Sequence, residues 1–368
     1  MKTIYPYPLG LLLAILVIAF VATKAYPGDQ LETGTVILKL SDSAELSRGQ
    51  GTWTPVDSPA RKTLLDIDMV DESLGWAVGT SGAILKYEGS NWKTASSPIA
   101  IDLTSVEMRN EQEGWAIGSL ADDTLILLEY KDLKWTKLGN TQNTWRYAEG
   151  TLTEVDITEQ QHRWLSWADY FDINLYGTSK GVVVGGQLVN GHMVLSALNA
   201  SGNWDLLYES NPPTAILGLS LLDNGAGWGV GVHTTLKFEA GDILTSWPKS
   251  AYLPAVLTAV STVNRNEAWA VGVEGVIAHY NGDEWVLYET NLKDVALFDI
   301  DMVSKNEGWA AGSQGTILHY LDGVWYIEKH ARWDLFRPTS MHAIDMISEE
   351  EGWAVGSYGQ IWHYQAEQ

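Results

Sequence analysis

One short motif recurs along the chain, and its spacing restricts the folds that are available. Variants of Gly-Trp-Ala-Val-Gly occur seven times in 368 residues, at intervals of 39, 67, 46, 41, 40 and 44 residues. The copies centre on Trp76, Trp115, Val182, Trp228, Trp269, Trp309 and Trp353. A glycine/aromatic motif with a period of about 40–45 residues is typical of a β-propeller, in which each repeat forms one blade.

Each copy of the repeat predicts four short strands. In the first copy, apolar or alternating runs at 64–70, 75–80, 83–88 and 91–96 are separated by turns rich in Gly, Ser and Asp. Runs of this length between such turns are typical of antiparallel strands. We therefore predict an all-β fold, a seven-bladed β-propeller of four-stranded blades, with the first strand of each blade innermost and the fourth outermost.

The two ends of the repeat region are incomplete in complementary ways. The last copy supplies three strands within 342–364, and the printed sequence then ends at 368. Residues 51–56 resemble an outermost strand, and 35–40 resemble a third strand, with no inner strands before them. Because closure pairs edges that would otherwise be exposed, we predict that 51–56 closes the ring on the last blade. Whether that blade has four or five strands stays open.

The N-terminal 25 residues are typical of a targeting segment. Lys2 precedes an apolar run at 9–22, and Ala25 offers a small-residue cleavage site. The run is short of the roughly 20 apolar residues that a membrane span needs. We expect residues 1–25 to be a signal peptide, with an uncleaved membrane anchor as the alternative. In either case 26–368 forms one propeller outside the cytoplasm, either secreted, periplasmic or on the outer face of a membrane.

Charge and cysteine content exclude several classes of function. The net charge of −23 argues against nucleic-acid binding, which needs clustered Lys and Arg. The absence of Cys excludes disulfides, thiolate metal sites and thiol nucleophiles. No phosphate-binding loop, zinc-binding helix motif or nucleophile elbow occurs. We therefore expect no cofactor, no metal, no catalytic residue and a monomeric chain.

A polar residue occupies one position of the predicted innermost strand in every copy. The set is Asp68, Glu107, Asn174, Ser220, Ser261, Asp301 and Asp345. The carboxylates among them could bind a hard cation such as Ca²⁺ in the channel, or they could accept hydrogen bonds from backbone or Trp N–H groups between blades. Recurrence in blade after blade favours the second interpretation. His279, His319 and His363 also recur with the repeat, which argues against a metal triad.

The repeat resembles that of a known family. The segments GWAVGTSGAILKYEGSNW at 75–92 and GWAAGSQGTILHYLDGVW at 308–325 are similar to repeats of the photosystem II stability/assembly factor-like propellers, a branch of the sialidase-type (BNR) superfamily. The resemblance implies a non-enzymatic, extracytoplasmic seven-bladed propeller. It also implies a binding or assembly scaffold for a protein or peptide, such as a membrane-protein segment, because photosynthetic members bind a membrane-protein subunit.

The alternative function is a carbohydrate-binding or degenerate glycosidase-like propeller. A sialidase site needs three Arg on the substrate carboxylate, because the guanidinium group binds carboxylates bidentately. This chain has only eight Arg in all, and the sialidase Asp-box is eroded, with NGDEW at 281–285 the nearest remnant. These departures argue against sialidase-type catalysis.

Two inserts interrupt the repeat, at about 139–168 and 327–341. Both join the outermost strand of one blade to the innermost strand of the next, so both emerge on one face of a propeller. Arg with exposed Trp is the composition of interface hot spots, although these loops could also pack on the rim or bind a glycan. We predict a binding site where they meet over the channel mouth, formed by Trp145, Arg163, Trp164, Trp167, Arg332, Trp333 and Arg337.

Overall fold

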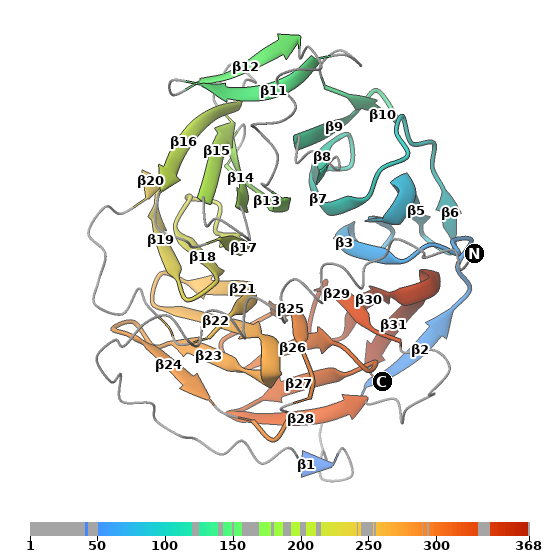
Figure 1. Cartoon of the computed structure of the whole chain (residues 1–368). Helices are drawn as coiled ribbons and strands as arrows, with labels where there is room; N and C mark the ends of the chain where they lie inside the picture. Colours follow the sequence, from blue (N-terminus) through green and yellow to red (C-terminus); the bar gives the residue numbers. More distant parts are fainter. Residues whose placement is uncertain are drawn as a thin grey trace, which may run out of the picture.

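The fold was analysed in a computed structural model of the whole chain. It describes residues 41–42, 51–119, 125–138, 143–148, 151–156, 169–177, 180–186, 193–198, 204–210, 215–240, 242–243, 253, 255–288, 290–292, 294–329 and 339–366. In these ranges the chain forms sheets arranged radially around a central opening, which is a β-propeller (Figure 1). None of the described helices is long and apolar enough to cross a membrane.

The strands of the described ranges form six four-stranded sheets, one five-stranded sheet and one two-stranded ribbon. The prediction of an all-β propeller is therefore confirmed. The finer prediction of seven four-stranded blades is wrong, because only six sheets have four strands. The five-stranded sheet gains its extra strand from the N-terminal part of the chain, which pairs with its outer edge.

The sheet of the first repeat copy matches its predicted strands closely. It consists of β3 (Leu64–Asp71), β4 (Leu74–Gly79), β5 (Ala83–Glu88) and β6 (Trp92–Thr94). The turn between β4 and β5 contains Ser81 at φ 58° and Gly82 at φ 71°. Positive φ is the conformation that glycine adopts at least cost, so the Ser-Gly pair ends one strand and starts the next.

Three further sheets follow in chain order with the same up-and-down topology. They are β7 (Leu103–Asn110), β8 (Glu113–Ser119), β9 (Leu125–Lys131) and β10 (Lys134–Lys137); β13 (Asp169–Tyr176), β14 (Lys180–Gly186), β15 (Met193–Leu198) and β16 (Trp204–Ser210); and β17 (Ile216–Leu221), β18 (Gly227–Gly231), β19 (Thr235–Glu239) and β20 (Asp242–Ile243).

The remaining sheets complete the ring. They contain β21 (Leu257–Asn264), β22 (Glu267–Gly272), β23 (Ile277–Tyr280) and β24 (Trp285–Tyr288); β25 (Leu297–Met302), β26 (Glu307–Gly312), β27 (Ile317–Leu321) and β28 (Val324–Lys329); and β29 (Met341–Met346), β30 (Glu351–Gly356) and β31 (Ile361–Ala366). In the part of the chain that the structure describes, short 3-10 turns lie at Thr80–Gly82, Val273–Gly275 and Ser357–Gly359.

The N-terminal strand closes the ring as predicted. Strand β2 (Gly51–Val56) pairs antiparallel with β31 along its full length, with Trp53 opposite Tyr364. The resulting sheet has the order β2-β31-β30-β29 and joins the two ends of the repeat region (Figure 1). Strand β1 (Ser41–Asp42) pairs in parallel with β28 and so extends the neighbouring sheet. Residues 35–40, the other candidate for a fifth strand, lie outside the described residues.

Part of the first insert forms a separate ribbon. Strands β11 (Asn143–Ala148) and β12 (Thr151–Asp156) pair only with each other, in antiparallel register. The ribbon lies at the periphery of the ring, between the sheets that contain β9 and β16 (Figure 1). The repeat motif does not predict this hairpin, because the hairpin lies in an insert between two copies of the repeat.

The core lies between neighbouring sheets and is built from the repeated aromatic residues. Trp76 of β4 is 2 % exposed, and Trp135 of the next sheet meets it edge to face at 5.4 Å. Steric contacts explain why the repeated motif contains glycine at two positions. A Cβ at Gly75 would overlap the sulfur of Met69, and a Cβ at Gly79 would overlap the carbonyl oxygen of Thr63. Glycine therefore allows the close approach of β4 to β3.

Candidate functional site: the central channel and the insert face

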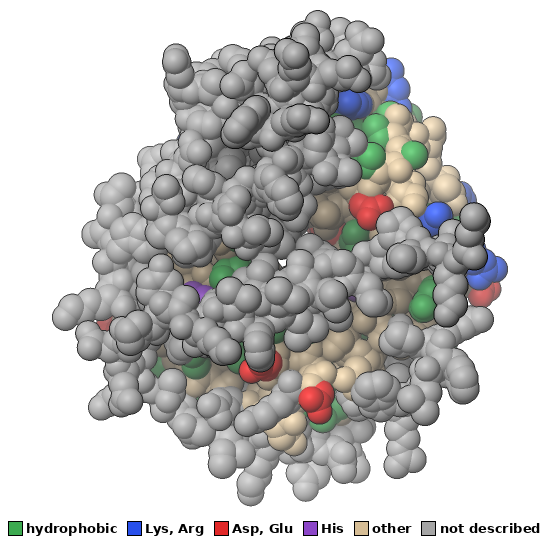
Figure 2. Space-filling view, viewed as in Figure 1, with side chains coloured by type: hydrophobic (Ala, Val, Ile, Leu, Met, Phe, Trp, Pro, Cys, Tyr) green, Lys and Arg blue, Asp and Glu red, His purple; other side chains and the backbone are tan. Residues whose placement is uncertain are grey.

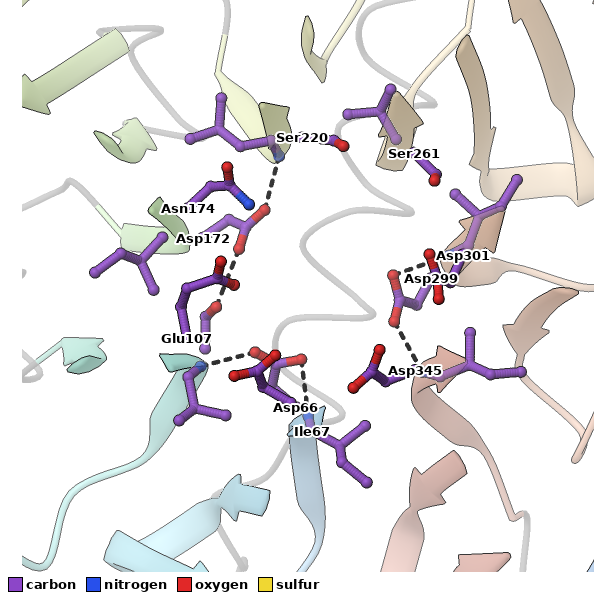
Figure 3. Close-up of a pocket in the computed structure, with 18 residues that line it drawn as sticks. Asp66, Ile67, Glu107, Asp172, Asn174, Ser220, Ser261, Asp299, Asp301 and Asp345 are labelled. Carbon is purple, nitrogen blue, oxygen red and sulfur yellow. Dashed lines mark hydrogen bonds between the residues drawn. The ribbon is translucent and has the colours of Figure 1, made fainter. Parts of the chain in front are cut away.

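The innermost strands surround a polar cavity of about 160 Å³ at the centre of the ring. The predicted inward positions all line this cavity, from Asp68 on β3 round to Asp345 on β29 (Figure 3). Every blade contributes through the same strand, since β3, β7, β13, β17, β21, β25 and β29 are consecutive neighbours around the ring. This confirms the prediction that these side chains ring the channel.

Each of these side chains accepts a hydrogen bond from the backbone of the next innermost strand. Met108 N donates to Asp68 Oδ2 at 2.6 Å, and Met69 N donates to Asp345 Oδ2 at 2.5 Å. The remaining donors and acceptors are Leu175 N to Glu107, Leu221 N to Asn174, Thr262 N to Ser220, Met302 N to Ser261 and Met346 N to Asp301. The bonds form a closed circle around the channel, so the structural interpretation of the repeat carboxylates is confirmed.

The indole N–H groups take no part in this circle. Those of Trp76, Trp309 and Trp353 are buried without a hydrogen-bond partner. Their rings instead meet neighbouring aromatic rings; for example, Trp353 contacts Trp92 edge to face at 5.6 Å. This is the arrangement that the ring quadrupole favours. Of the two kinds of donor expected for the inward carboxylates, backbone N–H groups therefore make the bonds, and these indole N–H groups do not.

A second layer of carboxylates lies two residues before the first, and the sequence analysis missed it. Val106 N donates to Asp66 Oδ2 at 2.7 Å, Leu219 N donates to Asp172 Oδ2 at 2.7 Å, and Ile344 N donates to Asp299 Oδ2 at 2.8 Å. The available signal was the Asp-x-Asp or Asp-x-Asn spacing on three innermost strands. These three aspartates therefore also link neighbouring sheets.

Burial changes the protonation of both layers. Burial raises the pKa of Asp66, Asp172 and Asp299 from 3.8 to about 7, and repulsion among these carboxylates adds to the increase. Burial also raises the pKa of Asp68 to about 7 and that of Asp301 to about 6. The pKa values of Glu107 and Asp345 lie well above their ordinary range, because of burial and the nearby charge of Asp68.

The channel carboxyl groups are used in hydrogen bonds between neighbouring sheets. Within the described residues, no group of three or more His, Asp or Glu side chains has an arrangement that could hold a metal ion. The pKa shifts place several carboxyl groups near neutrality, and such shifts often mark functional sites, although structural networks produce them too. Here each channel carboxyl group with a raised pKa accepts a hydrogen bond from a backbone N–H group of a neighbouring sheet.

The three repeat histidines lie in three different sheets. His279, His319 and His363 stack on Trp269, Trp309 and Trp353 at 4.1, 4.2 and 3.9 Å between ring centroids. The Nε2 atom of each contacts a glutamate at the start of the preceding strand, at 2.7, 2.9 and 3.0 Å. The three histidines lie in separate blades and do not form a triad, as the repeat predicted; His319 also contacts a second glutamate, Glu328, through Nδ1 at 2.8 Å.

The predicted binding residues belong mostly to parts of the chain outside the described residues. These are Arg163, Trp164, Trp167, Arg332, Trp333 and Arg337. Trp145 lies in β11, where it pairs with Glu154 of β12 in the peripheral ribbon. Whether the predicted residues come together over the channel mouth stays a prediction.

Basic side chains are also present on the described surface. In the view of Figure 2 they lie along the right-hand edge of the ring, near β6 and β10. Lys93, Lys131 and Lys134 are exposed residues of these two sheets. Lys93 is ion-paired there with Glu88 at 2.7 Å.

Solved structures with the same fold were found, whereas no family model and no curated protein matches the chain. A structure of YCF48 bound to D1 peptide has a TM-score of 0.60 at 19 % identity, and the match covers 86 % of this chain and 97 % of the other. YCF48 from Cyanidioschyzon merolae has a TM-score of 0.59 at 15 % identity, covering 85 % and 98 %. The WD40 propeller domain of Doa1 gives 0.60 at 12 %, covering 87 % and 98 %.

At these identities the similarity establishes the fold. Two of the three structures are of YCF48, which agrees with the resemblance of the repeat to photosystem II assembly factor-like propellers. The third comes from a different type of propeller, so the ring architecture alone does not select one function. The chain is similar over most of its length to β-propellers that include a peptide-bound example.

Proposed function

We propose that this chain is a non-enzymatic, extracytoplasmic propeller that binds a protein or peptide segment through the face carrying the two inserts. The observation that carries the proposal is the match over 86 % of the chain to a propeller with a bound peptide. The channel supports it indirectly, because each inward position is used in a bond between blades. Recognition is then left to surface loops.

The chemistry of the inserts indicates the kind of segment. Arg163 and Arg332 would place guanidinium groups beside Trp on a molecule with a net charge of −23. A cationic patch on an acidic protein steers acidic or carboxylate-bearing partners to one face. We therefore propose an acidic protein segment as partner, with a membrane-protein segment as one source of it. N-terminal anchoring or export would place the propeller on the side of the membrane where such a segment is exposed.

The test is peptide binding to the full chain and to two matched charge-reversal variants. The variant Arg163→Glu/Arg332→Glu should bind an acidic peptide roughly tenfold or more weakly, with a smaller salt dependence. The control Arg265→Glu/Lys305→Glu makes the same change at exposed residues of the turns between first and second strands, on the opposite face. Equal weakening in both variants, or cross-links to those turns, would contradict the proposed face.

The carbohydrate alternative makes different predictions. A retaining glycosidase needs two carboxyl groups free to act on substrate at about 5–5.5 Å, and an inverting one needs about 6.5–9.5 Å. The channel carboxyl groups accept backbone hydrogen bonds instead, for example Asp301 from Met346 N at 2.9 Å. Hydrolysis of a fluorogenic sialoside, or selective binding on a glycan array with no peptide binding, would favour the alternative.

A further inference from the structure

One histidine of the ring is held between two carboxylates. His319 on β27 is 2 % exposed; its Nε2 lies 2.9 Å from Glu307 Oε1, and its Nδ1 lies 2.8 Å from Glu328 Oε1. Glu307 is on β26 and Glu328 is on β28, so the histidine connects the strands on either side of its own. The imidazole also stacks on Trp309 at 4.2 Å and 9°.

The same network reaches the strand that closes the ring. Trp53 Nε1 on β2 donates to Glu328 Oε2 at 2.9 Å, although β2 belongs to the neighbouring sheet. On its other side β2 is held by Tyr364, whose hydroxyl oxygen accepts a hydrogen bond from Gly51 N at 3.1 Å. A continuous chain of contacts therefore runs Glu307–His319–Glu328–Trp53. It ties the closing strand to a sheet with which it shares no backbone ladder.

Hydrogen-bond counting shows that this network needs an additional proton. A neutral imidazole has one N–H, and an ionised carboxylate only accepts hydrogen bonds. Because both ring nitrogens of His319 lie within hydrogen-bonding distance of a carboxylate, both contacts can be hydrogen bonds only with one more proton. That proton sits on the imidazole or on a carboxyl group, and it belongs to the three groups together.

The surroundings favour keeping that proton. Burial raises the pKa of Glu307, contact with His319 opposes the shift, and the charges of Glu349 and Asp322 raise it further. Tyr364 on β31 also faces this region, and burial with the charges of Glu328 and Glu307 raises its pKa above the ordinary range. Within the described residues, the ion pairs of Glu307 and Glu328 are with His319 only. An imidazolium over the face of Trp309 adds a cation–π contact.

The second carboxylate is a departure from the repeat. His279 and His363 have the same Trp stack, and each contacts one glutamate, Glu267 or Glu351. The residue three positions after the outermost-strand Trp is Glu328 in this sheet, whereas Tyr288 and Val56 stand there in the sheets of His279 and His363. The extra acceptor therefore occurs at the sheet that neighbours the closing strand.

We propose that Glu307, His319 and Glu328 hold one shared proton that fastens the closing strand β2, and that loss of this proton as the pH rises loosens β2. With a neutral imidazole, one carboxylate would face a ring nitrogen lone pair, and two negative charges would remain on either side of a buried ring. The folded state then binds this proton more tightly than the unfolded state. The stabilisation is present while the network holds its proton, and it is lost when that proton is released as the pH rises.

The experiment compares β2 opening in the full chain and three variants at pH 6 and pH 9. Opening is measured as hydrogen-exchange protection of residues 51–56, corrected for intrinsic exchange rates. Glu328→Gln is the informative variant, because its amide can donate to a neutral His319 and its oxygen can still accept from Trp53. His319→Gln removes the histidine, and His279→Gln removes the matched histidine that has one carboxylate.

In the unmodified chain and in His279→Gln, protection of β2 should fall roughly tenfold or more from pH 6 to pH 9, as expected for losing one hydrogen bond to a charged group. In Glu328→Gln the protection should change little, and in His319→Gln it should be low at both values. The channel carboxyl groups are shared by all variants, so their pH dependence cancels in the comparison. Equal pH dependence in Glu328→Gln and the unmodified chain would overturn the proposal.

A second measurement does not depend on how the variants fold. In the unmodified chain, nitrogen-15 NMR of the histidine rings and carbon-13 NMR of the Glu carboxyl groups together report which of these groups carry protons. We expect Glu307, His319 and Glu328 to hold one proton among them at pH 6 and to have lost it by pH 9. A spectrum at pH 6 that shows neutral His319 and two ionised carboxylates would overturn the proposal.

Discussion

The circle of hydrogen bonds around the channel makes a sharp prediction for one residue. Asp68 Oδ2 accepts from Met108 N at 2.6 Å, while the equivalent bond in another sheet is made by Asn174, whose Oδ1 accepts from Leu221 N at 3.1 Å. The ring therefore already contains a neutral amide in the place of a carboxylate. Asp68→Asn should preserve the bond and remove a titrating group, whereas Asp68→Ala should remove the bond.

The expected changes in unfolding free energy follow from the hydrogen bond between Met108 N and Asp68 and from the raised pKa of Asp68. Leaving the buried Met108 N–H unpaired in Asp68→Ala should cost about 1–3 kcal/mol at every pH. Burial raises the pKa of Asp68 to about 7 from 3.8. A raised carboxyl pKa means that stability is complete below about pH 4 and is lost as the pH rises to about 7, by at most about 4 kcal/mol at 1.36 kcal/mol per pH unit. Neighbouring carboxyl groups share protons, so the loss from one group is smaller.

The assay is urea unfolding of the full chain and both variants at pH 5 and pH 8.5. Asp68→Asn should be close to the unmodified chain at pH 5 and more stable at pH 8.5, because at pH 8.5 the unmodified fold holds an ionised, buried Asp68 carboxylate, whereas the asparagine amide stays neutral. Asp68→Ala should be less stable than Asp68→Asn at both pH values. The reasoning is wrong if Asp68→Asn is the less stable protein at pH 8.5, or if the unmodified chain has the same stability at both.

Three further outcomes are expected. Deleting residues 26–57 should cause aggregation or a large fall in melting temperature, because it removes β2 and exposes the edge of β31; an unchanged melting curve would refute ring closure by this strand. Trp309→Ala should cost about 3–5 kcal/mol in urea unfolding, because the side chain is 0 % exposed. Leu133→Ala, at a site 79 % exposed, is its control and should stay within about 0.5 kcal/mol. If Trp309→Ala keeps full stability and loses ligand binding, Trp309 is a binding residue and not a structural one.

The repeat made the strands and the closure predictable because it encodes local geometry. The expected strand at 83–88 agrees with β5 (Ala83–Glu88), and the closing strand expected at 51–56 agrees with β2 (Gly51–Val56). Alternating apolar residues and fixed turn glycines set these boundaries directly. The last repeat copy lacks an outermost strand and the N-terminal segment supplies one. Their pairing was therefore predictable, since an open ring would expose two sheet edges.

Features that depend on departures from the repeat were harder to predict. Asp66, Asp172 and Asp299 occur on three innermost strands only, so comparison of the copies does not mark them as one layer. The β11–β12 hairpin lies in an insert without repeat text, and β1 is two residues long. The contact of Glu328 with Trp53 joins residues 275 positions apart in different sheets. Contacts between residues so far apart in the sequence can be identified only from the three-dimensional arrangement of the sheets.

The channel carboxyl groups respond to acid in the direction opposite to that of salt-bridged surface carboxylates. Salt-bridged surface carboxylates have lowered pKa values, so acid removes their stabilisation. Here burial raises the pKa of seven channel carboxyl groups, among them Asp66, Asp172 and Asp299, and the folded ring takes up protons that the unfolded chain would release. Acid therefore relieves repulsion in the channel in a protein of net charge −23. If β2 is also fastened by a proton, the channel and the closing strand respond to pH in the same direction, and the ring is most tightly closed on the acidic side of neutrality.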